Sequence, residues 1–403
     1  MNKALKVNLA ILTSVFIIYP LAALPLMFLF IRRNIKYSYY LLALFMGFLG
    51  YILIPETTND LTRYYETFQE VNQLNLPGLL NYLTTQLHYT FFIFSFIIGK
   101  LGLNKQFLPF FAVYISYLIN FLLFYNFSKN NNYTKAIYVI LFVTIFFTTP
   151  FKSIALSIRN FVALSFICWG VFKLFTEEKN IGWLYIGLAL ITHFMTLLLL
   201  PVIVAAKIFK EDNKWMRIAF LISFLFYFIP TGTLVENLLS IDLSAFELIE
   251  KKQVGYTTGY WATDYIDNMS STGRIFKFID ALATYIILFY LVITKEKSKY
   301  RNLLYLAAIL MNVFFSLPMI YRRYGFALRF LFILLLLYEY RDYYWQKSKR
   351  NLLIIIMMVS ILVSSARLYS MRQSALKSYP KMIYQSALTI FSNKINESDY
   401  IVK

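Results

Sequence analysis

Two side chains suited to phosphate binding and proton transfer lie inside long apolar stretches of the sequence. Arg159 lies in the apolar run 151–175, and His193, one of two histidines, lies in the next run, 181–206. Placing arginine at the centre of a membrane helix costs at least about 2.5–3.5 kcal/mol, so such an arginine usually faces the protein interior and has a function there. Its guanidinium matches phosphate oxygens, and an imidazole can transfer a proton near neutral pH. The pair therefore predicts a site where a phosphate-linked group leaves and a hydroxyl attacks.

The positions of the two residues along their runs allow one shared cavity. Arg159 is eight residues into its run, about 12 Å deep at the helical rise per residue. His193 is thirteen residues from the near end of the following, oppositely directed run, about 20 Å deep from the same face. An extended arginine side chain covers much of this difference. The alternative is that Arg159 reaches to an interface and His193 hydrogen-bonds to a neighbouring helix.

A polar segment, 55–86, follows the second apolar run and is long enough to be functional. Asp60 and Arg63 are three residues apart, which suits a helical ion pair. We expect Asp60 to bind a hydroxyl or act as a base, and Arg63 and Tyr64 to contact substrate. The alternative is a solvated helix cap with a weak surface ion pair.

Paired arginines also separate two later apolar runs. Arg322 and Arg323 are flanked by tyrosines on the side expected to be extracytoplasmic. Guanidinium pairs suit a diphosphate ligand, and Arg329, five residues into the next run, is a weaker candidate of the same kind. Interfacial anchoring is the alternative.

A second long polar segment, 234–275, contains several aromatic residues. Among them Tyr260 and Trp261 are candidates for contact with a sugar. The same residue types also line membrane interfaces, and the sequence leaves both interpretations open.

These candidates lie in a chain with the composition of a membrane protein. It has 403 residues, of which 59% are hydrophobic, and a mean hydropathy of +0.60, whereas soluble domains are about 45–50% apolar. We predict an all-α, polytopic integral membrane protein of about 12 transmembrane helices with two longer extracytoplasmic loops, 55–86 and 234–275. The transmembrane domain would occupy 1–366, followed by a basic tail, 367–403. The expected spans are 7–31, 37–54, 87–103, 107–127, 135–149, 151–175, 181–206, 215–233, 276–294, 302–320, 324–340 and 351–366.

The charge distribution indicates orientation. The net charge of +19, from 39 basic and 20 acidic residues, suits loop orientation and lipid contact rather than nucleic-acid binding. Basic residues concentrate after odd-numbered spans, which places those loops in the cytoplasm and the N-terminus outside. This counting puts the beginning of the span that holds Arg159 on the cytoplasmic side, away from the other candidates. Either a re-entrant piece near Pro150 changes the count, or the cavity runs deep from the outer face.

The sequence lacks the usual residues for cofactor chemistry. Cys168 is the single cysteine and there are two histidines, so we expect neither a disulfide nor a metal site. No nucleotide-binding or zinc-protease motif is present. We therefore expect no cofactor.

Three short motifs resemble those of EpsG-like, Wzy-type polysaccharide polymerases, in order and spacing over roughly residues 1 to 340. The first is the loop motif Asp60-x-x-Arg63-Tyr64-Tyr65 followed by Phe68. The second and third are Ile158-Arg159-Asn160-Phe161-Val162-Ala163 and Thr192-His193-Phe194-Met195-Thr196-Leu197. The chain departs from the family pattern in having Asn59 where glycine usually precedes the aspartate, and Met195 and Thr196 where small residues follow the histidine.

The resemblance implies a bacterial multi-pass protein of the cytoplasmic membrane that polymerises capsular, exopolysaccharide or O-antigen repeat units. Such a glycosyltransferase needs no metal or nucleotide and acts on undecaprenyl-diphosphate-linked oligosaccharide at the outer face of the membrane. Membrane lipids would surround it, and a chain-length regulator and a flippase of the same pathway are open as partners. Arginines would hold the leaving diphosphate, and His193 or Asp60 would accept the proton of the attacking hydroxyl.

Two other classes of protein fit part of the pattern. A transporter or flippase of lipid-linked saccharides would also use intramembrane arginines and aromatic side chains, but it needs no residue for proton transfer. A membrane acyltransferase would need a histidine with a positioned acid, and no Asp or Glu lies near His193 in the sequence.

Overall fold

The computed structural model describes residues 3–86, 88–209, 211, 214–230 and 271–402. Within these ranges the regular structure is helical, apart from one isolated bridge between Glu56 and Ile401, so the predicted all-α class is confirmed. Five segments are long and apolar enough to cross a membrane: Phe107–Asn130, Lys135–Leu156, Ile158–Phe175, Gly273–Ile293 and Arg350–Tyr369. Shorter apolar helices accompany them. The protein is thus a multi-pass helical membrane protein, although a count of about twelve crossing helices is not confirmed.

The N-terminal apolar run is two helices. The prediction of one helix over 7–31 is wrong: α1 (Lys3–Ile18) ends before a turn, and α2 (Leu24–Arg32) begins after it. Pro20 lies in this turn, where its missing N–H and its ring prevent a continuous helix. The next helix, α3 (Lys36–Tyr51), is largely buried and packs along α7 (Phe107–Asn130).

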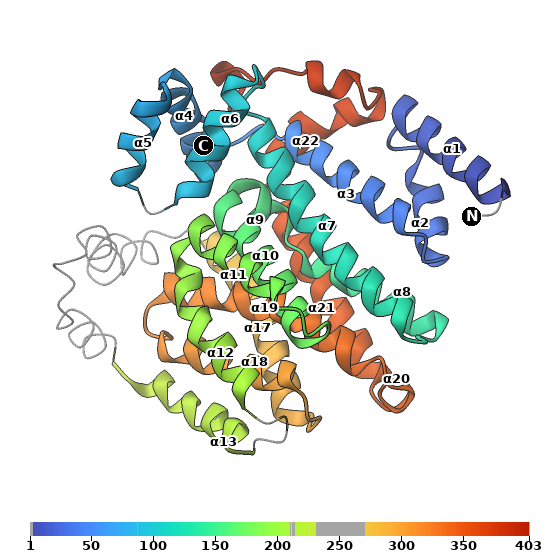
Figure 1. Ribbon diagram of the computed structural model, residues 1–403, viewed down its shortest axis with the longest axis vertical. Coiled ribbons are helices and arrows are strands. Elements are labelled where there is room, and N and C mark those ends of the chain that lie inside the picture. Colours follow the sequence, from blue (N-terminus) through green and yellow to red (C-terminus); the bar gives the residue numbers. More distant parts are fainter. Residues whose placement is uncertain (1–2, 87, 210, 212–213, 231–270, 403) are drawn as a thin grey trace.

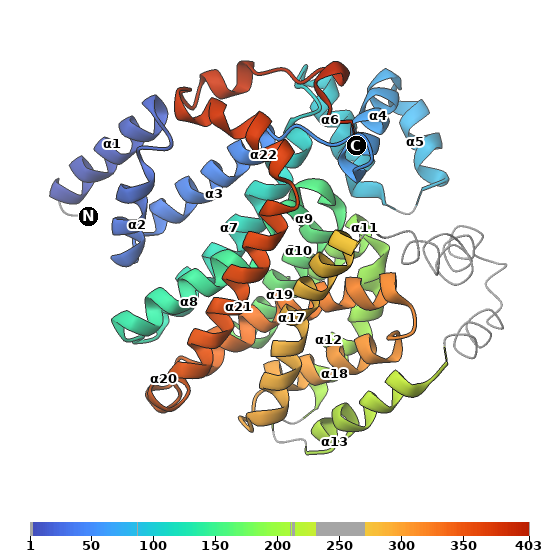
Figure 2. The same ribbon diagram turned by 180° about the vertical axis from the view of Figure 1, so that it is seen from behind.

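The centre of the molecule is a bundle of long apolar helices (Figures 1 and 2). The bundle consists of α7, α8 (Lys135–Thr148), α10 (Ile158–Phe175), α17 (Ser271–Ile293), α18 (Lys299–Val313), α19 (Pro318–Glu339) and α21 (Arg350–Tyr369). The helix α19 is buried on nearly all sides from Tyr324 to Leu337, as expected for a helix that is apolar all round. It therefore forms the core against which α10, α17 and α18 pack.

Two runs that are continuously apolar in sequence are broken helices. The run 151–175 divides at Ser157 into α9 (Phe151–Leu156) and α10. The run 181–206 divides at His193, whose backbone is extended, into α11 (Ile181–Thr192), the short helix η1 (Phe194–Leu198) and α12 (Leu199–Ile208). Hydropathy cannot detect these breaks, because apolar residues flank both.

The second break is a reversal of the chain. The Lys207 ammonium at the end of α12 lies 5.3 Å from the ring centroid of Trp183 at the start of α11. The two helices therefore form a hairpin with His193 at its tip. The helix α11 is held on α10 by close backbone approach: a Cβ at Gly170 would lie 2.8 Å from the carbonyl oxygen of Gly182, as small residues allow between membrane helices.

The first long polar segment is folded. It forms α4 (Asp60–Gln73) and α5 (Leu76–Thr84), and α6 (Tyr89–Lys100) packs on α4. After α21 the chain continues through α22 (Arg372–Ser378), η4 (Tyr379–Ile383), η5 (Thr389–Ser392) and η6 (Glu397–Asp399), over the same end of the molecule (Figure 1).

Hydrogen bonds between the segments that connect the helices show at which end of the bundle each segment lies. At one end, the Gln106 side chain donates to the carbonyl of Tyr51, 2.9 Å, and the Ile395 amide donates to Gln106, 3.0 Å. At the other end, Gln346 accepts from the amide of Thr134, 2.9 Å. The segment before α7 therefore lies beside the end of α3, so α6 does not carry the chain across the bundle.

The helices α8 and α9 together return the chain from the second end to the first. Arg159 consequently lies at the same end as the segment 55–86. This arrangement removes the conflict over the side of the membrane on which Arg159 lies. The loop count had treated the run 87–103 and the hairpin at His193 as one membrane crossing each. In the structure α6 does not cross the bundle, and the hairpin returns the chain to the end from which it started.

Candidate functional site

A polar cavity of about 1180 Å³ opens where helix ends converge at the first end of the bundle. Its wall combines the starts of α4, α10, α17 and α19, the end of α21 and the tip of the hairpin. Seven residues singled out in the sequence line it: Asp60, Arg63, Tyr64, Arg159, His193, Arg322 and Arg323. The prediction that Arg159 and His193 share a cavity is confirmed.

The cavity is strongly cationic. Among the described residues that line it, the basic ones outnumber the acidic ones by eight to three. The basic residues are Arg63, Lys152, Arg159, Lys277, Arg322, Arg323, Arg367 and Arg372, and the acidic ones are Glu56, Asp60 and Asp280. Such an excess of positive charge in a recess attracts an anionic ligand.

Arg159 lies in the first turn of α10, directly after the break at Ser157. It is therefore at a helix end and not eight residues inside a span. Its Nε donates to the hydroxyl of Tyr64, 3.3 Å, and its guanidinium carbon lies 4.9 Å from the centroid of that ring and 5.5 Å from that of Phe91. Burial raises the pKa of Tyr64, so its hydroxyl is neutral and can accept this bond. Two aromatic faces thus orient the guanidinium, as cation–π contacts do.

Asp60 is tied to both sides of the same region. It is the first residue of α4 and forms the predicted ion pair with Arg63. Its second oxygen accepts from the Ser157 hydroxyl, 3.3 Å, which connects α4 to the break before α10. The Asp60 and Arg63 side chains remain 43% and 60% exposed, so they are accessible to a ligand in the cavity.

The two histidines of the chain meet in the cavity wall. The ring centroids of His88, which precedes α6, and His193 are 4.8 Å apart, with 27° between the ring planes. Both side chains are buried and both line the cavity. His88 lies here against His193 and Phe194. This pairing could not be predicted from the sequence, because the two histidines are far apart along the chain.

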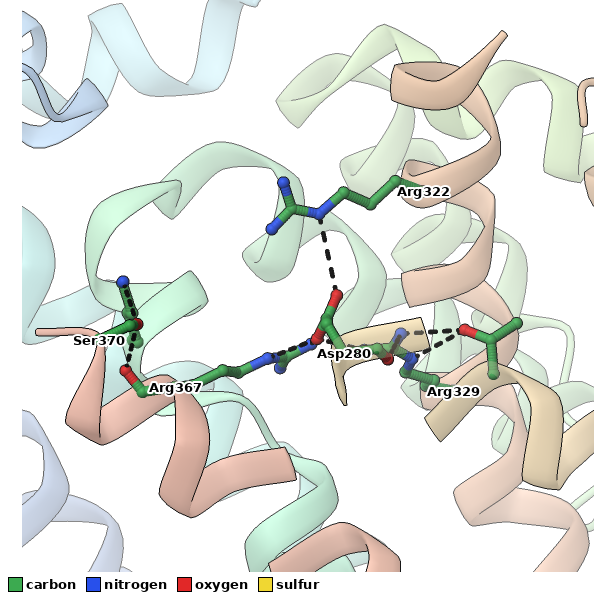
Figure 3. Close-up of polar contacts among 7 residues, drawn as sticks. Asp280, Arg322, Arg329, Arg367 and Ser370 are labelled. Atoms are coloured by element: carbon green, nitrogen blue, oxygen red, sulfur yellow. Dashed lines mark hydrogen bonds and ion pairs between the residues drawn. The ribbon is translucent and has the colours of Figure 1, made fainter. Parts of the chain in front are cut away.

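A second charged cluster forms around Asp280 of α17 (Figure 3). Its Oδ1 accepts from Arg329 of α19, 3.0 Å, and from the Nε of Arg367 of α21, 2.7 Å. Its Oδ2 faces the Nε of Arg322 at 3.8 Å. One carboxylate therefore holds three guanidiniums, and the cluster keeps a net positive charge.

The three arginines also surround one phenyl ring. Their guanidinium carbons lie 5.0 to 5.7 Å from the centroid of Phe326. Arg322 remains 42% exposed, whereas Arg329 is buried and also donates to the Thr284 hydroxyl, 3.1 Å. Arg329 is not among the described residues that line the cavity. Arg329 therefore lies behind the cavity wall, where it supports Asp280.

Four of the basic lining residues were not predicted from the sequence: Lys152, Lys277, Arg367 and Arg372. Lys152 lies in α9, before the break at Ser157, and donates to the Ser370 hydroxyl, 2.6 Å. Arg367 and Arg372 belong to the segment interpreted as a basic tail. In the sequence, a basic residue at the end of the last span is equally consistent with a lipid contact. Only the fold shows that it lines the cavity.

Tyr260 and Trp261 lie outside the described residues. Among the residues that the structure does describe, no group of three or more His, Cys, Asp or Glu side chains is placed to hold a metal ion.

Comparison with known proteins identifies a family. Residues 54–386 match the model of the EpsG family. No curated protein and no solved structure matches the chain significantly. The matched region contains every residue of the cavity described above.

Proposed function

The chain belongs to the EpsG family, and on this premise we propose that it polymerises undecaprenyl-diphosphate-linked oligosaccharide repeat units into a capsular polysaccharide or exopolysaccharide. Family membership makes it a membrane protein of polysaccharide biosynthesis with a lipid-linked saccharide as substrate. The reaction would transfer the growing glycan from its lipid diphosphate to a sugar hydroxyl of another lipid-linked unit.

The observation that carries the proposal is the cationic cavity with groups for proton transfer in its wall. A lipid diphosphate is a dianion or more, and bidentate guanidinium donors suit its oxygens. Eight basic residues against three acidic ones leave a positive excess for it to neutralise. The cavity volume of about 1180 Å³ exceeds the usual range for a small ligand, about 300–1,000 Å³, which suits sugars attached to the diphosphate.

The reaction divides between two groups of residues. Arg159, Arg322 and Arg323 would stabilise the negative charge that develops on the leaving diphosphate, as oriented donors do for other leaving groups. A base in the cavity wall, where Asp60, His88 and His193 all lie, would accept the proton of the attacking hydroxyl. Arg63 and Tyr64 would position the sugars beside them.

The direction of the cavity supports catalysis at the outer face. The basic turns 32–36, 295–301 and 341–350 belong to the opposite end of the bundle. Basic connections are typical of the cytoplasmic side. The cavity would then open to the outside of the bacterial cytoplasmic membrane, where a flipped lipid-linked unit is available.

The alternative function is transport of lipid-linked saccharides. It would use the same arginines and aromatic side chains, but it would not need histidines in the cavity wall. The His88–His193 contact therefore favours the enzyme.

The experiment is to delete the gene and determine the mass and membrane side of the lipid-linked saccharides. Loss of a polymerase should leave single repeat units at the outer face, and complementation with Arg159→Ala should leave the same species. Single units retained at the inner face would indicate a flippase. Chains of normal length in the Arg159→Ala strain would contradict a catalytic role for that residue.

A further inference from the structure

The backbone at the hairpin tip restricts the protonation of His193. Its Nδ1 accepts a hydrogen bond from the amide of Met195, 3.3 Å, and so caps the start of η1. A nitrogen that accepts from an N–H cannot itself carry a proton. The proton of neutral His193 must therefore be on Nε2, because the hydrogen bond of one ring nitrogen sets the state of the other.

This tautomer makes His193 a donor and a poor base. Its Nε2–H can donate to an oxygen in the cavity. Accepting a second proton would place it on Nδ1, which would break the cap at Met195 and put a buried cation beside His88. The same stacking that brings the rings to 4.8 Å thus opposes charge on both of them at once, because like charges disfavour each other's charged form.

We propose that His88 is the base that accepts the proton of the attacking sugar hydroxyl, and that His193 stays neutral beside it as a hydrogen-bond donor. The catalytic part of this inference rests on the proposed polymerase function. The protonation states do not depend on it.

The step balances as follows. The hydroxyl proton passes to a ring nitrogen of His88 while the hydroxyl oxygen forms a bond to the anomeric carbon of the donor sugar. The bond from that carbon to the diphosphate oxygen breaks, and the electron pair leaves with the diphosphate. The His88 imidazolium then returns its proton to the departing diphosphate or to water.

The charges around the cavity couple this step to substrate. The ionisable groups that share the cavity with the histidines are Asp60, Arg63 and Tyr64 of α4, Tyr82 of α5, Lys152 of α9, Arg159 of α10, Lys277 and Asp280 of α17, Arg322 and Arg323 of α19, Arg367 of α21, Arg372 of α22 and Glu56 before α4. Their positive excess opposes a charged imidazole in the empty cavity. A bound diphosphate neutralises that excess and so makes His88 a stronger base when the leaving group is present.

The chain offers a direct measurement, because it contains only two histidines. Labelling the full-length protein with ¹⁵N-histidine in lipid nanodiscs gives nitrogen signals from these two rings alone, and the variants His88→Phe and His193→Phe assign them. We expect His193 to remain the Nε2–H tautomer between about pH 5 and 8, while His88 titrates in that range. Inorganic diphosphate should raise the midpoint of the His88 titration by about one pH unit or more. Protonation of His193 with His88 unchanged would overturn the assignment.

Activity provides the second readout, with the lipid-linked repeat unit extracted from the deletion strain as substrate. His88→Phe keeps an aromatic ring against His193 and removes the base, so kcat should fall at least about 100-fold. As a control, Thr90→Val removes the 3.2 Å bond between Thr90 and Thr192 beside the pair and should keep a rate close to wild type. A wild-type rate in His88→Phe would overturn the role of His88, whereas an inactive wild-type protein with the expected titration would instead count against the polymerase.

Discussion

Arg159 owes its orientation to contacts that differ from those of an arginine inside a lipid-facing helix. Tyr64 accepts from its Nε, and Tyr64 and Phe91 present ring faces to the guanidinium. The break at Ser157 puts the residue in the first turn of α10, where it opens on the cavity. A planar fork held between two rings is not interchangeable with a lysine ammonium.

Replacing Arg159 by lysine should therefore lower the polymerisation rate although the charge is kept. Removal of one oriented donor to a developing negative charge costs about 100-fold or more in kcat, and we expect a loss of that order. The measurement is the rate of conversion of lipid-linked repeat units by the purified variant. Tyr64→Phe is the matched control: it keeps the ring face, removes only the accepting hydroxyl and should cost far less. Equal losses in both variants would contradict this account of Arg159.

Asp280 has the opposite task, which is to keep arginines together. Arg322, Arg329 and Arg367 converge on its carboxylate. Without that negative charge, three guanidiniums would repel one another in a largely buried place.

The variant Asp280→Asn should consequently unfold more easily. Removing one partner of a buried ion pair costs about 3–5 kcal/mol, so thermal unfolding in detergent should occur at a clearly lower temperature. Glu178→Gln makes the same change of charge at an exposed turn and should leave the unfolding temperature nearly unchanged. An unaltered unfolding temperature in Asp280→Asn would show that the cluster does not stabilise the fold.

At the scale of elements, the C-terminal segment holds in place the residues that lead into α4. The Ile401 amide donates to the carbonyl of Pro55, 3.1 Å, and the Thr57 amide donates to the carbonyl of Ile401, 3.0 Å. The Tyr400 hydroxyl accepts from Lys105, 2.8 Å, and its ring lies against that of Tyr65. The last residues of the chain thus fix the segment that leads into Asp60.

Substituting Ile401 by proline should loosen this segment, because proline has no N–H to donate to Pro55. A lost backbone hydrogen bond of about 1–1.5 kcal/mol corresponds to roughly tenfold faster exchange, which hydrogen–deuterium exchange at the Thr57 amide would detect. Val402→Pro is the control, since Val402 is exposed and a following proline favours the extended backbone that Ile401 needs. Unchanged protection of Thr57 in Ile401→Pro would mean that the C-terminal segment does not hold the approach to α4.

For the whole molecule, the arrangement predicts one side for the cavity and the opposite side for the basic turns. Single introduced cysteines can test this with little labelling of the native cysteine, because Cys168 is buried. Thr58→Cys and Leu101→Cys should react with an impermeant thiol reagent added outside intact cells. Ser348→Cys should react only after permeabilisation. Labelling of Leu101→Cys and Thr58→Cys from opposite sides would show that α6 crosses the membrane after all.

The sequence determined much of this arrangement. Its composition was sufficient to predict an all-α membrane protein, and the cost of a charge in lipid was sufficient to select Arg159. Helix ends were harder to predict. Apolar residues surround Ser157 and His193, so no change of hydropathy marks the breaks at these two residues. Contacts between residues far apart in the chain could not be predicted from the sequence. The places of His88, Asp280 and Arg367 in the site are therefore seen only in the fold.

The most direct test of the central claim is reconstitution of the purified chain with lipid-linked single repeat units and no nucleotide. The account predicts lipid-linked chains of two or more units, with one undecaprenyl diphosphate released for each bond formed and loss of both products in Arg159→Ala. Recovery of single units unchanged in mass, whether or not they had moved across the bilayer, would contradict it.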